Sequence, residues 1–251
     1  GCQGDSELGD CPTGNLPLAL ALCHEDEPAA CDAPLGRWMA PIQREGRWVH
    51  DVSGALPLLA KGGTRRFAFY SKEPYEVTLS LRLSTAGKAL RPVETIPLWA
   101  GEVTFDASYD DAFEPRMVHI PQGAKKVELL TTITGHGTAQ PGNCAEFCDT
   151  QHTFSINGSE HVLGFPEIAN LQDCMERTAE GTVPNQYGTW WYGRAGFCPG
   201  KEVTPVLTDI TSDVTVGGEN LIGYEGSYQG GPYVGTGARV FRLTSAIVVS
   251  E

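Results

Sequence analysis

Short segments in which apolar and polar residues alternate predict β-strands along much of the chain. An alternation of period two places apolar side chains on one face of a strand and polar ones on the other. The apolar run Leu16–Leu22 is also predicted to be a strand, because Pro17 disfavours a helix interior. The alternating segments are Arg66–Tyr70, Glu76–Leu83, Lys126–Ile133, Thr153–Ile156 and Arg239–Val249.

Turn-forming residues separate these segments. The 251-residue chain contains 30 glycines and 17 prolines, and its helical patterns are scarce. This composition predicts an all-β fold of the sandwich or jelly-roll type, and the length allows one large domain or two smaller ones. The segment Ala86–Val93 separates two strand-rich blocks, so we expect domains at residues 1–86 and 87–251.

The chain is acidic. Its 31 acidic residues outnumber its 18 basic residues, which gives a formal net charge of −13. Nucleic-acid binding needs a basic face and is therefore not expected. No apolar run approaches the roughly 18 residues that cross a bilayer, so no transmembrane segment is expected.

Eight cysteines fall into four pairs of sequence neighbours: Cys2/Cys11, Cys23/Cys31, Cys144/Cys148 and Cys174/Cys198. An even number with local spacing, in a chain rich in glycine and proline, indicates disulfides and an oxidising compartment. Zinc sites are the alternative. They need cysteines about two to four residues apart, usually with histidine partners, and three of the four spacings do not fit.

The first residues of the chain are consistent both with a free protein and with one anchored to a membrane by lipid. No hydrophobic signal segment is present, so we expect the numbering to begin after its cleavage. Gly1-Cys2 is similar to the residues around a bacterial lipoprotein cleavage site, and lipidation of Cys2 would leave Cys11 without a partner. We therefore expect a secreted, periplasmic or lipid-anchored protein.

Four motifs in the second half carry a family resemblance. They are Leu130-Thr-Thr-Ile-Thr-Gly-His-Gly137, Asn143-Cys-Ala-Glu-Phe-Cys148, His152-Thr-Phe-Ser-Ile-Asn157 and Arg194-Ala-Gly-Phe-Cys-Pro-Gly200. In order and spacing they resemble the second domain of the peptide-N-glycosidase F family, from about Pro92 to the C-terminus. The resemblance implies two adjacent jelly-roll β-sandwiches and hydrolysis of the amide that links an N-glycan to asparagine. It also implies a site between the domains that needs no metal and no cofactor.

The resemblance also assigns disulfides and site residues. Three cysteine pairs resemble family disulfides, Cys23–Cys31, Cys144–Cys148 and Cys174–Cys198, which leaves Cys2–Cys11 as an additional pair. Glu146 resembles an interface glutamate that assists the reaction as a proton donor or by orienting water; stiffening of the loop is the alternative. Arg194 resembles an arginine that would bind a sugar or amide oxygen; a structural salt bridge is the alternative.

Other positions of this half depart from the family pattern. His136 replaces a tryptophan that stacks on sugar, and it can itself stack, hydrogen-bond or be a plain loop residue. Gly193 and Phe197 stand where the family usually has Asp and Trp. Aromatic side chains suit sugar rings but also fill sandwich cores, so we expect half of six aromatic residues in this part of the chain to be buried. One of the six, Trp191, is expected to bind substrate. The other aromatic residues considered are Trp190, Tyr192, Tyr224, Tyr228 and Tyr233.

The N-terminal domain is predicted to be a reduced version of the family's first jelly roll. After Cys31-Asp32 the chain passes directly to Leu35–Pro41, so the family's Trp-Asp-Arg strand, whose Asp is the primary catalytic group, is missing. The position at which the family has a second carboxylate corresponds to about Lys72 in this chain, and Glu73 is one residue away.

The segment from Cys23 to Asp32 contains four carboxylates, and two of them, Asp26 and Asp32, are candidates for the lost catalytic acid. Clustered acids shift one another's pKa, as acid–base catalysis requires. A solvated acidic loop is the alternative, and an EF-hand Ca²⁺ spacing is absent. The sequence also lacks the His-x-His of copper oxidases and the Gly-x-Ser-x-Gly elbow of serine hydrolases.

Two functions are consistent with these observations. The first is an amidase that hydrolyses the GlcNAc–Asn bond of N-glycans or glycopeptides. The second is a non-catalytic module on the same scaffold that binds a glycan or another surface protein. We expect a monomer in either case.

Overall fold

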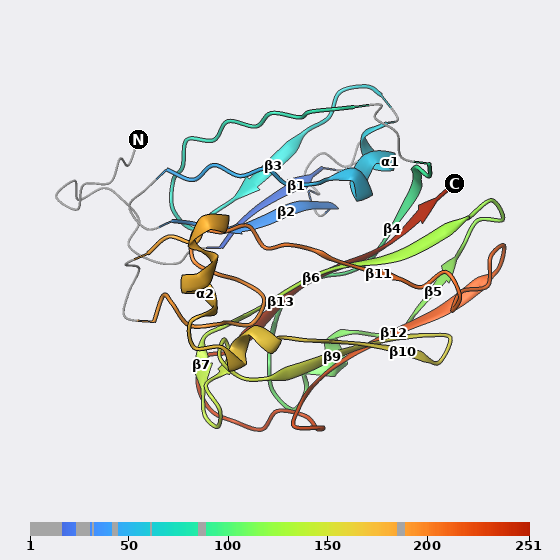
Figure 1. Cartoon of the computed structure of the whole chain (residues 1–251). Coiled ribbons are helices and arrows are strands. Elements are labelled where there is room, and N and C mark those ends of the chain that lie inside the picture. The colour runs from blue at the N-terminus through green and yellow to red at the C-terminus, as the bar shows by residue number, and fades with distance from the viewer. Residues whose placement is uncertain are drawn as a thin grey trace.

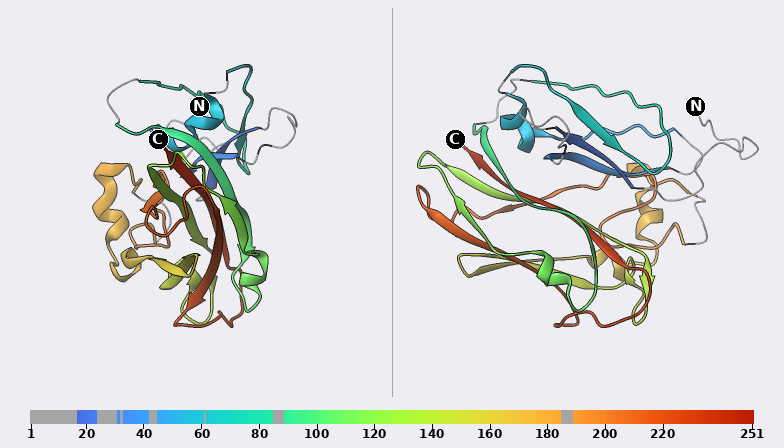
Figure 2. Two further views of the ribbon diagram at one scale, coloured as in Figure 1. Left: turned by 90° about the vertical axis from the view of Figure 1, so that its right-hand side faces the viewer. Right: turned by 180° about the vertical axis from the view of Figure 1, so that it is seen from behind.

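The computed structural model describes residues 17–23, 31, 33–41, 45–60, 62–84, 89–184 and 189–251. Within them, three main β-sheets are stacked as layers (Figures 1 and 2). The N-terminal sheet lies on one face of a four-stranded sheet, whose other face packs against a second four-stranded sheet. The predicted domain boundary between residues 86 and 87 lies outside the described residues.

The N-terminal sheet consists of β1 (Pro17–Leu22), β2 (Ala33–Met39) and β3 (Phe67–Tyr70), in the order β2-β1-β3 with antiparallel pairing. Two short helices, η1 (Ser53–Ala55) and α1 (Leu56–Leu59), lie between β2 and β3. Buried Leu20, Leu22 and Leu35 form a small core beneath them. The strands predicted at Leu16–Leu22 and Arg66–Tyr70 are thereby confirmed.

The C-terminal sandwich consists of two antiparallel four-stranded sheets, in the orders β11-β6-β13-β4 and β10-β9-β12-β5. The strands of the first sheet are β4 (Pro92–Thr104), β6 (Lys126–His136), β11 (Val206–Asp209) and β13 (Val240–Ser250). The strands of the second sheet are β5 (Arg116–His119), β9 (Thr150–Ile156), β10 (Ser159–Gly164) and β12 (Glu219–Tyr228). The smaller elements are η2 (Tyr109–Ala112), β7 (Thr138–Ala139), β8 (Cys144–Ala145), η3 (Pro166–Ala169), α2 (Asp173–Glu176) and η4 (Arg177–Glu180).

The core of the sandwich follows the predicted alternation. On β13, Phe241, Leu243 and Ile247 are buried between the two sheets, and the strands predicted around Lys126–Ile133 and Thr153–Ile156 are confirmed. Aromatic rings pack edge to face across this core, as between Phe105 and Phe241 with ring centroids 4.9 Å apart. The described residues therefore have the expected all-β fold with a reduced N-terminal part.

One predicted strand is wrong. Residues 76–83 belong to no sheet, and Figure 1 shows this segment as a trace along the outside of the N-terminal sheet. Its apolar side chains Val77, Leu79 and Leu81 are exposed rather than half buried. Alternation predicts which side chains share a face, but a strand also needs a neighbouring strand for its backbone hydrogen bonds, and the sheet ends before this segment.

The N-terminal sheet is fastened to the outer face of the sandwich by polar and apolar contacts. The Thr95 hydroxyl donates to the carbonyl of Gly54 at 2.5 Å, and the Trp48 ring N–H donates to the carbonyl of Gly200 at 2.9 Å. A small apolar cluster of Met39, Phe197 and Val203 joins β2 to the segment before β11.

Three of the expected disulfides are present: Cys23–Cys31, Cys144–Cys148 and Cys174–Cys198. Cys2 and Cys11 lie outside the described residues, so their pairing stays a prediction.

Candidate functional site

The Cys144–Cys148 loop holds Glu146 through its backbone. The Glu146 N–H donates to the carbonyl of Gly137 at 3.0 Å, and its own carbonyl accepts from the N–H of Ala195 at 3.0 Å. The loop is thus tied on one side to the end of β6 and on the other to the Arg194 segment. These two bonds fix the backbone of Glu146 in place.

Arg194 forms an ion pair with the carboxylate of Glu146. Its guanidinium also donates to the carbonyl of Thr189 at 2.5 Å, and it lies over the rings of Phe147 and Phe197, 5.0 and 5.6 Å from their centroids. The side chain is buried, and its Nε has no hydrogen-bond partner among the described residues. Arg194 is therefore held by an ion pair, a hydrogen bond and two aromatic contacts, and the salt bridge that the sequence left as an alternative is present.

In this ion pair, burial shifts both pKa values more than the attraction between the opposite charges does. The pKa of Glu146 is raised, because burial disfavours the charged form more than Arg194 favours it. The pKa of Arg194 is lowered, again chiefly by burial, although Glu146 opposes the change. Both pKa shifts favour the neutral forms, so burial of this ion pair costs free energy. Removal of either partner would leave the other charge buried and unpaired.

His136 lies at the end of β6, beside the ion pair. Its ring stacks on Phe197 with centroids 4.8 Å apart, and its Nε2 lies 2.9 Å from the Thr134 hydroxyl. Burial, assisted by surrounding cations, lowers the pKa of His136 to about 3. His136 is therefore neutral at physiological pH.

The N-terminal part adds cations to this region. Arg37 on β2 crosses to the sandwich, where it donates to the carbonyl of Arg242 at 2.8 Å and to the hydroxyls of Thr244 and Thr134 at 3.0 and 3.3 Å. Lys72, just after β3, is close enough for its charge to lower the pKa of His136. Neither residue was identified as a site residue from the sequence, because both act across the boundary between the sheet and the sandwich.

The predicted carboxylate partners of Glu146 cannot be placed. Asp26 and Asp32 lie outside the described residues. In the part of the chain that the structure describes, Arg194 is the charged group that acts on the pKa of Glu146. A role for Asp26 or Asp32 in catalysis stays a prediction.

A strip of aromatic rings runs from the Glu146 loop along the segment before Arg194. Trp190, Trp191, Tyr192 and Phe147 contact one another edge to face, with ring centroids 5.4 to 6.3 Å apart. All four side chains are half buried, whereas Tyr224 and Tyr233 are buried in the sandwich core. Two of the six aromatic residues considered are therefore buried, fewer than the expected half, because Tyr228 is also half buried.

An open cavity of about 590 Å³ adjoins this strip. Phe147 belongs both to the strip and to the lining of the cavity. Its volume lies in the range of small-molecule sites, and its other lining residues include Asp149, Gln151, Tyr228 and Gln229.

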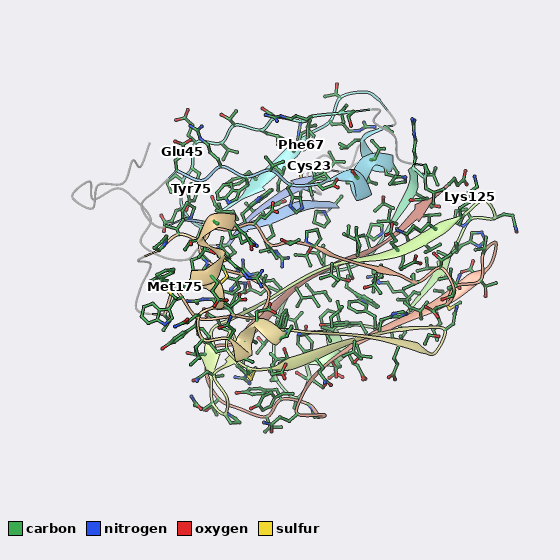
Figure 3. All side chains as sticks on the ribbon, viewed as in Figure 1. Cys23, Glu45, Phe67, Tyr75, Lys125 and Met175 are labelled. Carbon is green, nitrogen blue, oxygen red and sulfur yellow. A yellow bond between two sulfur atoms is a disulfide. The ribbon has the colours of Figure 1, made fainter. Side chains whose placement is uncertain are left out.

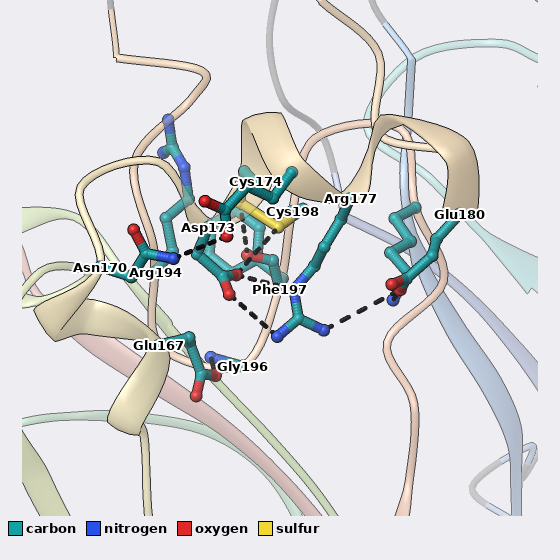
Figure 4. Close-up of a disulfide and its surroundings, with 12 residues drawn as sticks. Glu167, Asn170, Asp173, Cys174, Arg177, Glu180, Arg194, Gly196, Phe197 and Cys198 are labelled. Atoms are coloured by element: carbon teal, nitrogen blue, oxygen red, sulfur yellow. Dashed lines mark hydrogen bonds and ion pairs between the residues drawn. A yellow bond between two sulfur atoms is a disulfide. The ribbon is translucent and has the colours of Figure 1, made fainter.

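The Cys174–Cys198 disulfide supports the site from the other side (Figure 4). Asp173 beside it accepts two hydrogen bonds from Arg177, at 2.8 and 3.0 Å, and Figure 4 shows both residues next to Cys198. Asp173 and the two sulfur atoms lie close enough together for a metal ion. The sulfurs are bonded to each other, so they are not the thiolates that such a site would need.

Gly193 shows how tightly this segment is packed. A Cβ at this position would collide with the backbone carbonyl groups of Glu167 and Asn170. We expect Gly193→Ala to lower the free energy of unfolding by about 1–3 kcal/mol, because backbone atoms cannot move aside as a side chain can. Chemical denaturation checks this, with Gly231→Ala as the control, since no atom lies near a Cβ there. Equal effects of the two substitutions would contradict the expectation.

Comparison with known proteins places these residues in a family. The profile of "Peptide-N-glycosidase F, C terminal" matches residues 104–245, more than half of the chain. The chain belongs to the peptide-N-glycosidase F family. The matched region includes Glu146, Arg194, His136 and Trp191.

Relatives of the peptide-N-glycosidase F family agree in sequence and fold. Peptide-N(4)-(N-acetyl-beta-D-glucosaminyl)asparagine amidase F of Elizabethkingia miricola is 30% identical over 142 residues, which are 53% of this chain and 37% of the relative. A crystal structure of a peptide-N(4)-(N-acetyl-beta-D-glucosaminyl)asparagine amidase has a TM-score of 0.72 at 18% identity and covers 96% of this chain and 80% of its own. PNGase F, a glycosylasparaginase from Flavobacterium meningosepticum, has a TM-score of 0.68 at 18% identity, with 97% and 81% covered.

The sequence match thus spans little more than a third of the curated relative. The N-terminal part, which carries Arg37 and Lys72, lies outside the family profile, whereas the structural match covers 96% of the chain. Among the described residues, no helix is both long and apolar enough to span a membrane.

Proposed function

We propose that this peptide-N-glycosidase F family member binds N-linked glycans of glycoproteins or glycopeptides without cleaving them. The observation that carries the proposal is the half-exposed strip of Trp190, Trp191, Tyr192 and Phe147, which leads into the 590 Å³ cavity. Flat aromatic rings next to a polar cavity suit a sugar chain, which has apolar ring faces and hydroxyl groups.

The pairing of Glu146 with Arg194 supports binding rather than hydrolysis, although the raised pKa of Glu146 suits a proton donor. Acid–base catalysis needs a group that can exchange a proton with the substrate, whereas the Glu146 carboxylate is occupied by Arg194. Among the described residues, the charged side chains of the N-terminal part that act on His136 are the cations Arg37 and Lys72, which cannot act as the carboxylate base.

An amidase is the second candidate, favoured by the family match and by the presence of Glu146 in it. In this version Glu146 and Arg194 position the GlcNAc–Asn bond, and Asp26 or Asp32 activates water. Incubation with a denatured N-glycoprotein, followed by mass spectrometry, separates the two functions. Glycan release with conversion of Asn to Asp, abolished by Glu146→Gln, would refute the non-catalytic proposal. No release at high protein concentration is the expected result.

We expect Trp191→Ala to weaken binding of an N-glycopeptide by about tenfold, the loss of roughly 1.4 kcal/mol that removal of one aromatic anchor causes. Calorimetric titration measures the change in Kd. Leu221→Ala is the control, because Leu221 is an exposed apolar residue on β12 that lies seven residues, about 23 Å, from Tyr228 of the cavity. Equal affinities of both variants would place the glycan elsewhere.

We further propose that the protein works as a monomer outside the cytoplasm, either secreted, periplasmic or anchored by lipid at Cys2. The three disulfides are typical of an oxidising compartment. Mass spectrometry of the native N-terminus distinguishes a lipidated Cys2 from a Cys2–Cys11 disulfide.

A further inference from the structure

A second cavity lies at an open edge of the C-terminal sandwich. It has a volume of about 220 Å³, and β6 and β11 of one sheet and β10 of the other contribute to its lining. Because β10 and β11 are edge strands, no further strand closes the sandwich here among the described residues. An apolar cavity of roughly 150 Å³ already accommodates benzene, so this cavity has room for a ring-sized molecule. It shares no lining residue with the cavity beside the aromatic strip.

The part of the lining that comes from the two sheets is apolar except for one hydroxyl group. Ile133, Leu163 and Val206 supply apolar side chains. Thr131 on β6 also lines the cavity, is only 1% exposed, and its hydroxyl has no hydrogen-bond partner in the described part of the chain. Buried hydroxyl groups nearly always have a partner. An unpartnered one in the lining of a cavity indicates a place for a polar atom of a ligand.

The helices and loops that complete the lining carry five charged side chains, and one of them, Glu167, is unpaired. The other four have partners: Asp173 pairs with Arg177 at 2.8 Å, Lys201 pairs with Glu180 at 2.6 Å, and Glu202 lies 3.3 Å from the His50 ring. Glu167 forms no ion pair with any cation that the structure describes, and burial raises the pKa of its carboxyl group. A ligand cation beside this carboxylate would offset the cost of burying its charge.

A chain of contacts joins Glu167 to the strand that carries Thr131. The Glu167 carboxylate accepts from the N–H of Gly196 at 3.3 Å, and Figure 4 shows the two residues side by side. Gly196 in turn packs so closely on the carbonyl of Ile133 and the ring of Phe165 that a Cβ would not fit there. Ile133 lies two residues after Thr131 on the same face of β6, which is a distance of about 7 Å. A small molecule can therefore reach both the carboxylate and the hydroxyl group within one cavity.

We propose that this cavity binds a small organic ammonium compound with a second polar group at its other end. The ammonium group forms a charge-assisted hydrogen bond with the Glu167 carboxylate, the apolar body lies against Ile133 and Phe165, and the second polar group bonds to the Thr131 hydroxyl. A ligand carboxylate in place of the ammonium group would face Glu167 and be repelled. This site is separate from the proposed glycan site, so its occupation does not depend on glycan binding.

The test is an NMR titration of the intact chain with three probes of similar size. Tyramine carries an ammonium group and a hydroxyl group on opposite sides of a benzene ring, phenethylamine lacks the hydroxyl group, and para-hydroxyphenylacetate reverses the charge. We expect tyramine to bind with a Kd on the order of 1 mM and to shift the amide signals of Gly164 and Gly196, which line the cavity. Para-hydroxyphenylacetate should bind at least about tenfold more weakly, the loss expected when a charge-assisted hydrogen bond is replaced by repulsion.

Two variants assign the polar contacts. Glu167→Gln keeps an oxygen for the Gly196 N–H but removes the charge, so it should weaken tyramine binding about tenfold. Thr131→Val keeps the shape of the side chain but removes the hydroxyl group, so tyramine and phenethylamine should then bind equally.

Glu94→Gln is the matched control for Glu167→Gln, because it makes the same change in net charge far from the cavity. Glu94 is exposed on β4 and is separated only by Val249 of β13 from Val127, two residues after Lys125. Figure 3 shows Lys125 and Met175, which belongs to α2 beside the cavity, at opposite ends of the molecule. Tyramine should bind to the control as it does to the unchanged protein.

Four results would overturn the proposal. The first is equal binding of tyramine and para-hydroxyphenylacetate to the unchanged protein, which needs no variant to fold. The second is a titration in which the signals of the aromatic strip shift and those of the cavity do not. The others are equal losses in Glu167→Gln and Glu94→Gln, and the absence of any shift with tyramine well above the expected Kd. None of these results bears on glycan binding, which the glycopeptide titration tests separately.

Discussion

Arg194→Met is expected to lower the free energy of unfolding by about 3–5 kcal/mol, which is typical when one partner of a buried ion pair is removed. Methionine fills much of the space between Phe147 and Phe197 but leaves the Glu146 carboxylate unpaired in a site where burial already raises its pKa. Urea denaturation at pH 7 measures the loss.

A double substitution tests whether the loss comes from the unpaired charge. Gln at position 146 removes the charge but keeps the size of the side chain, so Arg194→Met with Glu146→Gln should be more stable than Arg194→Met alone. The single variant should also recover part of its stability as the pH falls and Glu146 becomes protonated. If the second substitution recovers nothing, the aromatic contacts of Arg194 and not its ion pair hold this region together.

Acid is expected to destabilise the protein strongly below about pH 6.5, with His152 as one contributor. This residue is buried, with Nδ1 2.7 Å from the Tyr224 hydroxyl, and burial lowers its pKa to about 3. Between pH 6.5 and about pH 3, the unfolded chain binds a proton at His152 but the folded chain does not. The free energy of unfolding therefore falls as the pH falls. The loss from His152 reaches roughly 3 kcal/mol at pH 4.

Other groups add to this pH dependence or oppose it. The pKa of His136 is also lowered to about 3, so His136 acts in the same direction. The pKa of Glu146 and of Glu167 is raised by burial, which makes their contribution to stability larger in acid and offsets part of the loss.

Denaturation curves between pH 4 and 7 measure the acid effect in a His152→Asn variant. The variant should be less stable overall but should show a flatter dependence on pH. His119→Asn is the control for loss of a histidine at the surface, because the His119 side chain is 58% exposed. An unchanged slope in His152→Asn would assign the acid sensitivity to other groups.

Sequence alone predicted the sandwich better than the N-terminal part. On β6 and β13 the alternation of apolar residues matches the burial closely, because each strand has a partner on both sides and a core on one face. For residues 76–83 the same pattern misleads, since no adjacent strand continues the sheet. The alternation of apolar and polar residues predicts which side chains share one face of a strand. It does not predict whether a neighbouring strand is present.

The sequence predicted which residues belong to the candidate site, but it did not predict which of them contact one another. The family motifs drew attention to Glu146 and Arg194, while their mutual pairing follows from the fold of segments 48 residues apart. Arg37 lies 97 residues from Thr134, and the only local signal was a charged residue inside a strand. Such contacts depend on how the N-terminal sheet is placed on the sandwich, which sequence periodicity does not contain.

The N-terminal sheet also conceals surface that the sandwich would otherwise expose to water. Gly54 lies against the side chains of Leu130 and Val248, and Val248 is 2% exposed although it lies on the outer face of its sheet. A fragment that begins at about Pro92 and lacks the N-terminal part would uncover these apolar residues and free the acceptors that now bind Arg37. The motif-rich half is therefore not a self-sufficient piece for expression, and its solubility depends on the less recognisable residues that precede it.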